Sequence, residues 1–234
     1  MLYIRKSEPS KEAGEEISRV RREYKYLLEK RTPESAREAF DHLDKGFIRD
    51  SLVKEQHGIC AYCMRRIESN IHMTIEHWSP IEFEPDRAVN YSNMLGVCNG
   101  GREKKYEAYL DDGRRILCCD ASKGDRKITI SPLNPEHMKL IRYSADGMIY
   151  THPEDETLTT DMNEVLNLNS IILVEGRKQA YESYVRFISG LVKRNKPIRN
   201  AIEKEIERLK NKATYDEFAG VVIYFLERKL KRVQ

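Results

Sequence analysis

The stretch CAYCMRRIESNIHMTIEHWSP, residues 60–80, combines two cysteines separated by two residues with an adjacent glutamate and histidine. The C-x-x-C spacing lets the sulfurs of Cys60 and Cys63 face one point, as a tetrahedral zinc site requires. The run HMTIEHW has a β-like composition and contains Glu76 and His77 near its end, and Ser79-Pro80 follows it as a turn signal. The stretch is therefore either a structural metal site alone or a structural metal site followed by the first residues of an active site.

The composition sets limits on what the chain can bind and where it works. Its 234 residues include 41 Lys and Arg against 38 Asp and Glu, so the net charge is only +3. A polyanionic partner would have to be held by local basic patches rather than by a global field. No apolar run approaches the roughly 20 residues of a membrane span, and the N-terminus lacks the basic region followed by an apolar region that marks a signal peptide. We therefore expect a cytoplasmic protein whose cysteines stay reduced.

The periodicity of apolar residues predicts an α+β fold that is predominantly helical. Apolar residues spaced by three to four positions indicate helix over much of residues 1–58. In the stretch TPESAREAFDHL, the first residue, Thr32, can cap a helix. Residues 59–135 are rich in Cys, Gly, Asn and Pro and contain short β-like runs. Residues 136–234 begin with a hairpin around Asp146-Gly147 and continue as three helices, near 170–195, 198–212 and 215–233. The chain is thus a metal-bearing centre between two helical regions.

A zinc site of the four-cysteine kind needs a second pair of ligands. LGVCNGG supplies Cys98, and ILCCDASKGD supplies Cys118 or Cys119. These cysteines lie beside Gly and Asp rather than in apolar helices, which favours zinc binding. The alternative is that all five cysteines are small buried hydrophobic side chains.

Glu76 and His77 offer the two functions that phosphodiester cleavage requires. A histidine can act as the base that produces the nucleophile, and a carboxylate can anchor a hard divalent cation that neutralises charge on the phosphate. Consecutive strand residues point to opposite faces, but the bend after the strand can bring both side chains to one site. The alternative is an ordinary structural histidine, because the dipeptide Glu-His is common.

Taken in order, C-x-x-C, EHWSP, NMLGVC and CDASKG resemble the motifs of the HNH endonuclease family. The resemblance implies a ββα-metal core, in which a two-stranded hairpin and a helix hold one catalytic Mg²⁺ or Mn²⁺, buttressed by a four-cysteine zinc knuckle. It implies His77 as general base, Glu76 and Asp120 as ligands of the catalytic cation, and Asn93 as the residue that braces the site. The implied zinc ligands are Cys60, Cys63, Cys98 and Cys119.

The motifs also depart from the family pattern. Glu76 stands where Asp or His is commoner, and Asp120 replaces a His or Asn, although both remain oxygen donors for Mg²⁺. Twenty residues separate Cys98 from Cys119 instead of two, so a loop is inserted in the knuckle. Cys119 is preferred to Cys118 because only Cys119 gives the spacing C-D-x-x-K-G.

Within the family, CAYC, IEHW-x-P, Y-x-NMLGVCNGG, ISPLNPE and LNLN are similar to the HNH subunit of Septu-type anti-phage defence. This likeness spans roughly residues 50–180. It implies an endonuclease that cleaves phage DNA together with an ABC-type ATPase subunit. Relatives in retron operons make cleavage of RNA, such as tRNA, the alternative. The rival from another class is a zinc-knuckle module that binds nucleic acid or a partner protein without cutting.

Basic residues gather along the chain near the predicted site. Arg102, Lys104 and Lys105 lie in the insert, and Lys123 lies just beyond it. Such side chains contact phosphates without reading sequence, so we predict that they bind the substrate. The alternative is a solvated loop whose charge is balanced by its own aspartates.

Overall fold

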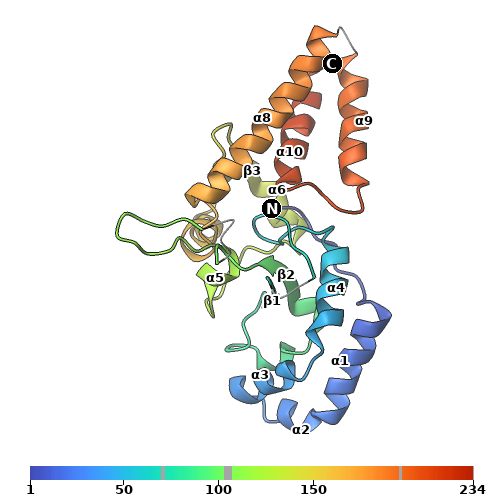
Figure 1. Ribbon diagram of the computed structural model, residues 1–234, viewed down its shortest axis with the longest axis vertical. Coiled ribbons are helices and arrows are strands. Elements are labelled where there is room, and N and C mark those ends of the chain that lie inside the picture. The colour runs from blue at the N-terminus through green and yellow to red at the C-terminus, as the bar shows by residue number, and fades with distance from the viewer. Residues whose placement is uncertain (70–71, 103–106, 195–196, 234) are drawn as a thin grey trace.

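The computed structural model describes residues 1–69, 72–102, 107–194 and 197–233 (Figure 1). Helices dominate the fold, and two two-stranded antiparallel sheets accompany them. This confirms the predicted α+β, predominantly helical class. In the described part of the chain, no helix combines the length and the apolar character needed to cross a membrane.

The N-terminal helices are α1 (Lys11–Glu23), α2 (Lys25–Leu28), α3 (Pro33–Asp41) and α4 (Lys45–Glu55). The predicted cap at Thr32 is confirmed, since its side chain accepts a hydrogen bond from the Ser35 amide at 3.3 Å. The first ten residues differ from the expected helix. They run as irregular chain, and the Ile4 amide donates to the Pro132 carbonyl at 2.8 Å. The side chains of Met1 and Ile4 are buried in the core, and this burial outweighs local helix propensity.

The central region is built on the hairpin of β1 (Met73–His77) and β2 (Met94–Cys98). The 3₁₀ turns η1 (Pro85–Arg87) and η2 (Tyr91–Asn93) connect the strands, and the short helix α5 (Cys119–Lys123) follows. In the antiparallel register Met73 faces Cys98 and His77 faces Met94. A strand pair followed by a helix is therefore present where the sequence predicts one.

Gln56, at the C-terminal end of α4, ties the hairpin to the cysteine loop. Its side chain donates to the carbonyls of Gly96 at 2.7 Å and Ile59 at 3.0 Å, and accepts from the Gly96 amide at 2.7 Å. A Cβ at Gly96 would lie 2.6 Å from the terminal methyl of Met73, which would have to shift to admit it. The hairpin and the loop that carries Cys60 are thus fixed relative to each other.

The C-terminal region contains α6 (Pro135–Leu140), β3 (Ile141–Tyr143), β4 (Ile149–Thr151), α7 (Glu156–Thr160) and the π-helical turn η4 (Asp161–Val165). The three long helices that follow are α8 (Ile171–Lys193), α9 (Ile198–Lys210) and α10 (Ala219–Leu230), near the predicted ranges. The predicted hairpin turn is confirmed at Gly147, whose φ of +93° favours glycine.

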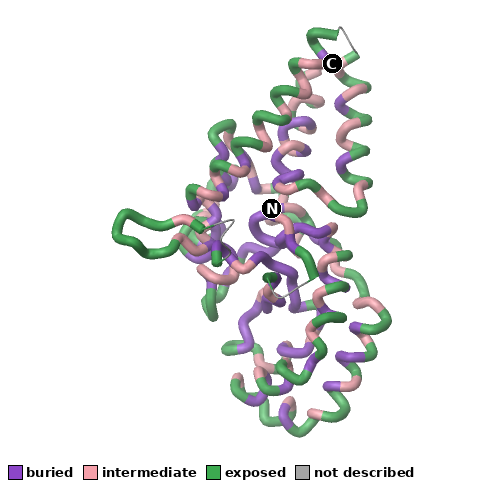
Figure 2. Tube along the Cα trace, viewed as in Figure 1, coloured by how far each residue is buried: buried purple, intermediate pink, exposed green. Residues whose placement is uncertain are grey.

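Most of the buried side chains form one core. It takes apolar residues from each of the ranges 1–58, 59–135 and 136–234, and Figure 2 shows it concentrated around the hairpin and the N-terminus. A second, smaller cluster lies between α9 and α10, made by Ile202, Leu209, Ile223 and Leu226. The helices on both sides therefore hold the central region in place through shared packing.

Candidate metal centre and active site

Four buried cysteines meet beneath the hairpin. One ligand sulfur each from Cys60, Cys63, Cys98 and Cys119 lies within 4.8 Å of the others. The sulfur separations are 3.9 Å for Cys60–Cys119 and 3.6 Å for Cys63–Cys98, far longer than a disulfide bond. Zinc bound tetrahedrally at about 2.3 Å from each sulfur requires separations of about 3.8 Å. The set fits a metal ion such as zinc, and the predicted ligand set is confirmed as a cluster.

Cys118 lies beside the cluster without belonging to it. The buried Arg65 guanidinium donates through Nη2 to the sulfur of Cys118 at 3.2 Å and to that of Cys98 at 3.3 Å. Four thiolates around one divalent cation leave a net negative charge, which a buried guanidinium offsets. Arg65 was missed from the sequence, although a basic residue two positions after C-x-x-C is the signal that points to it.

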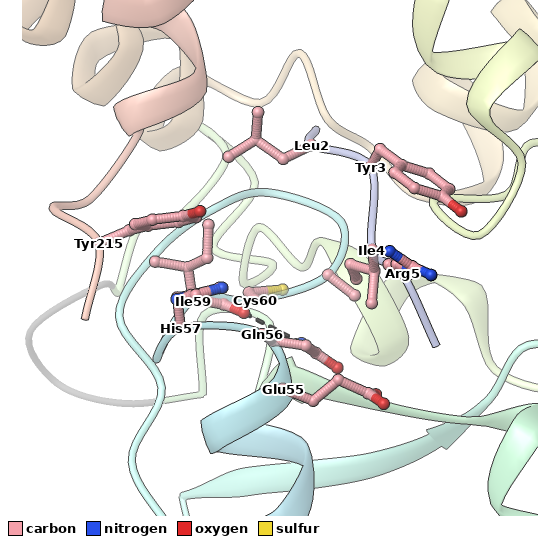
Figure 3. A pocket seen from close by; sticks show the side chains of 11 residues that line it. Leu2, Tyr3, Ile4, Arg5, Glu55, Gln56, His57, Ile59, Cys60 and Tyr215 are labelled. Atoms are coloured by element: carbon pink, nitrogen blue, oxygen red, sulfur yellow. Dashed lines mark hydrogen bonds between the residues drawn. The ribbon is translucent and has the colours of Figure 1, made fainter. Parts of the chain in front are cut away.

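Two distant segments of the chain border a cavity of about 190 Å³ beside the cluster. Figure 3 shows Cys60 at this cavity together with N-terminal residues and Tyr215. The Tyr215 ring stacks on His57, with centroids 4.2 Å apart. The Tyr215 amide donates to the His57 carbonyl at 2.8 Å, and the Phe218 amide to the Met64 carbonyl at 3.0 Å. The cysteine loop is therefore a docking point for the segment that enters α10.

A second site lies in a pocket of about 320 Å³ between α3, β1 and α5. Glu76, His77 and Asp120 all line it, although Glu76 and His77 are consecutive residues of β1. The carboxylates of Glu76 and Asp120 interact with each other. The three residues predicted to form the catalytic site therefore line one pocket, and their roles in catalysis stay a prediction.

His77 is held in one orientation. Its Nε2 lies 2.8 Å from the Ala88 carbonyl, which can only accept, so Nε2 carries the hydrogen. The edge of the ring packs on Phe40, with centroids 4.7 Å apart. Burial lowers the pKa of His77 to about 4, although the bond to Ala88 acts in the opposite direction. The imidazole is neutral at pH 7, with the lone pair on Nδ1.

Asn93 braces the bend that follows His77. Its Nδ2 donates to the Ser79 carbonyl at 2.9 Å, and its Oδ1 accepts from the Ser79 amide at 2.9 Å. The Trp78 amide donates to the Asn93 carbonyl at 3.0 Å. These three bonds join η2 to the segment after β1, which is the bracing geometry that the resemblance implies for this residue.

Lys123 is a correction to the predicted surface contact. Its side chain is only 1% exposed, and Nζ lies 2.6 Å from Glu76 Oε1 and 3.2 Å from the His77 carbonyl oxygen. The physical reason is its place on α5 three residues after Asp120, which turns both side chains toward the same pocket. Lys123 thus acts within the site rather than on a basic surface.

The charge environment of Glu76 is unusual. Burial raises the pKa of this carboxyl to about 8; Lys123 opposes the shift and Asp120 adds to it. The carboxyl therefore gains from any nearby cation, whether an ammonium or a metal ion. Glu76 and Asp120 suit Mg²⁺, which usually takes one or two protein carboxylates and completes its shell with water and phosphate oxygens.

Of the remaining predicted substrate contacts, the structure describes only Arg102. Arg102 is exposed in the insert, away from the residues that line the pocket. Lys104 and Lys105 lie outside the described residues. In the insert, Arg114 pairs with Asp112 at 2.7 Å and Arg115 with Glu107 at 2.8 Å, so part of its charge is balanced locally.

Tyr62 links the cysteine cluster to the pocket. It sits between Cys60 and Cys63, is fully buried, and donates its hydroxyl to Glu76 Oε1 at 3.2 Å. Sequence reasoning missed it, because a C-x-x-C motif draws attention to its cysteines and not to the residues between them. The same turn that holds two metal ligands thereby positions a carboxylate of the second site.

We expect Tyr62→Phe to lower the free energy of unfolding by about 1–3 kcal/mol, because a buried carboxylate loses a donor. Zinc content should not change, since the cysteines are untouched. Chemical denaturation and metal analysis measure the two quantities. The control is Tyr109→Phe, an exposed tyrosine, for which a change within about 0.5 kcal/mol is expected. Equal losses in the two variants would contradict the link.

Comparison with models of protein families finds no match to this chain, and comparison with curated proteins finds none either. What can be said of function therefore depends on the geometry of the two sites and on the motif resemblance.

Proposed function

We propose that the chain is a metal-dependent endonuclease of the HNH type, which hydrolyses phosphodiester bonds of DNA. The supporting observation is the pocket in which His77, Glu76 and Asp120 converge, with the His77 ring fixed by the Ala88 carbonyl. A neutral, oriented base and two neighbouring carboxylates are the chemical groups that such a reaction needs.

In the proposed reaction, His77 Nδ1 accepts a proton from the attacking water, while the N–H at Nε2 continues to donate to the Ala88 carbonyl. Glu76 and Asp120 would hold a Mg²⁺ or Mn²⁺ ion, which supplies charge neutralisation at the phosphate and the leaving oxygen. Tyr62 and Lys123 both contact Glu76 Oε1 and position this carboxyl group. Asn93 keeps the bend after β1 closed, so His77 stays at a fixed place relative to the carboxylates.

The cysteine cluster has a structural part in this proposal. Zinc held by Cys60, Cys63, Cys98 and Cys119 would fix the start of α5, which carries Asp120 one residue after Cys119. Reduced thiolates of this kind persist in the cytoplasm, which is the proposed location. The proposed targets are phage DNA, with an ABC-type ATPase as partner subunit; these two points are supported by the motif resemblance.

A second candidate function is a zinc-knuckle module that binds nucleic acid or a partner without cutting. One observation favours it: Lys123 Nζ already lies 2.6 Å from the Glu76 carboxylate and neutralises a group that a catalytic cation would use. Buried ion pairs also occur as purely structural features. Cleavage of RNA in place of DNA is the alternative within the nuclease proposal.

The deciding experiment is a Mg²⁺ and Mn²⁺ titration of the purified chain, with and without the ATPase, on phage DNA and on total RNA. We expect metal-stimulated cleavage of DNA. Glu76→Gln and Asp120→Asn should each reduce it by more than the roughly 10- to 100-fold typical of outer-shell partners. Glu84→Gln, which removes an acid paired to Arg87 outside the pocket, should cut normally.

Other outcomes lead to other assignments. Cleavage of RNA alone, lost in the same two variants, would move the substrate to RNA. No metal-stimulated cleavage of either nucleic acid in the presence of the ATPase would favour the binding module. Equal cleavage by all variants would remove Glu76 and Asp120 from the reaction.

A further inference from the structure

A groove of about 940 Å³ runs between α6, the β3–β4 hairpin and α10. It shares no lining residue with the pocket that holds His77. Its walls come from chain segments that are distant in sequence: Tyr3 from the N-terminal segment, Arg142 and Tyr150 from the hairpin strands, and Arg228 from α10. The proposed cleavage reaction does not use any of these side chains.

The groove is strongly basic, although basic and acidic residues are almost equal in number over the whole chain. Four of its lining side chains are Lys or Arg and one is an acid, Glu227, whereas the whole chain has 41 basic and 38 acidic residues. Glu227 is engaged with Lys210 at 2.6 Å. Among the residues that the structure describes, no carboxylate forms an ion pair with Arg142, Arg228 or Lys231. Their charge is available to an anion.

Two of these cations also form hydrogen bonds to neutral oxygens. Arg142 Nη1 donates to the carbonyls of Lys139 at 2.6 Å and Ile141 at 2.9 Å. The Arg228 guanidinium lies 3.4 Å from the Tyr224 hydroxyl. Bonds to neutral oxygens leave both guanidinium charges uncompensated, and they reduce the ordering that binding an anion would require.

Aromatic rings accompany the charge. Tyr3 is 48% exposed and Tyr150 is 41% exposed, although large aromatic side chains are normally more buried. Tyr224 lines the same groove, with its ring packed edge-on against Tyr143 at 5.5 Å. Exposed rings beside unpaired cations are what proteins use to bind single strands, because bases stack on the rings while cations follow the phosphates.

We propose that this groove binds a single-stranded segment of nucleic acid, with Arg142, Arg228 and Lys231 on the phosphates and Tyr3 and Tyr150 against bases. In naming the substrate of the endonuclease, the inference rests on the proposed function, but binding needs no cleavage. A duplex hides its base faces in the stack, so the rings favour single strands. An acidic peptide has charge but offers no bases to the tyrosines.

The test measures binding by fluorescence anisotropy of labelled 20-nucleotide oligo(dT) and oligo(U), and of a 20-base-pair duplex, on the full chain without added divalent cation. Arg228→Glu combined with Lys231→Glu should weaken single-strand binding about tenfold or more and lower the salt slope by about 1.4, the value for two phosphates. Tyr150→Ala should cost about 5- to 100-fold on single strands and little on the duplex. The matched control, Arg186→Glu with Lys193→Glu on α8, makes the same charge change outside the groove and should bind like wild type.

Three results would overturn the inference: no binding by wild type, equal binding by groove and control variants, or equal displacement of oligo(dT) by polyglutamate. Duplex binding as tight as single-strand binding, with no effect of Tyr150→Ala, would overturn the single-strand assignment. Failure of the proposed nuclease function gives a different set of results from failure of the groove proposal. Groove-dependent binding without metal-stimulated cleavage refutes the nuclease alone, and metal-stimulated cleavage together with single-strand binding that the groove variants leave unchanged refutes the groove alone.

Discussion

His77→Ala is expected to lower metal-stimulated cleavage by about 10²- to 10⁴-fold, the usual contribution of a general base. The reason is geometric. His77 Nε2 is committed to the Ala88 carbonyl, so the lone pair that can accept a proton is on Nδ1, and an alanine side chain offers no such acceptor. The rate of plasmid cleavage in Mn²⁺, at a fixed concentration of the partner ATPase, measures the loss.

The His77 variant needs a control because the ring is also packed against Phe40. His77→Gln keeps a donor for the Ala88 carbonyl and should be folded, with normal zinc content, yet inactive. His42→Ala removes an exposed histidine that stacks on Tyr24 and lies outside the pocket, and it should cleave at the wild-type rate. If His77→Ala and His77→Gln cleave fully, the assignment of the base is wrong.

The second large effect concerns the cysteine cluster. Cys119→Ser is expected to lose the zinc ion and to unfold the central region, because binding free energy at a structural zinc site is folding free energy. In small zinc-binding peptides that free energy is about 10–16 kcal/mol, which exceeds the stability of a typical domain. The variant should therefore show an early thermal transition, which wild type should show only after strong chelation.

Cys118→Ser is the matched control for this prediction. Cys118 is the preceding residue, is equally buried, and lies 3.2 Å from Arg65 Nη2 rather than among the four clustered sulfurs. Metal analysis should find one zinc ion per chain in Cys118→Ser and none in Cys119→Ser. The opposite pattern would exchange the roles of the two cysteines, and zinc-free wild type with unchanged stability would remove the metal from the fold.

Much of the candidate site could be predicted because its residues lie in short sequence motifs that follow one another in a fixed order. The C-x-x-C turn fixes two sulfurs by spacing alone, and C-D-x-x-K-G separates Cys119 from Cys118 by register. The β-like runs before His77 and around Met94 correctly indicated the hairpin. Local rules suffice where neighbours in sequence remain neighbours in space.

The rest depends on contacts between distant parts of the chain. Lys123 reads as a surface cation, yet its partner Glu76 lies 47 positions earlier, and only the fold shows that the two meet. The opening residues have no helical role, because their apolar side chains complete a core made elsewhere. The basic groove takes its walls from the N-terminus, the hairpin and α10, so no window of sequence shows its charge.

The insert between Cys98 and Cys119 is a place where the sequence can change in length with little effect on the rest of the fold. Its twenty residues leave and re-enter at two ligands of one cluster, and its tip is closed by a bridge between Tyr109 and Arg115. Doubling the length of a flexible loop costs only about 0.6 kcal/mol in closure entropy. Insertions or deletions in this segment should therefore change the free energy of unfolding only slightly. Its surface residues can vary while the metal cluster and the hairpin stay the same.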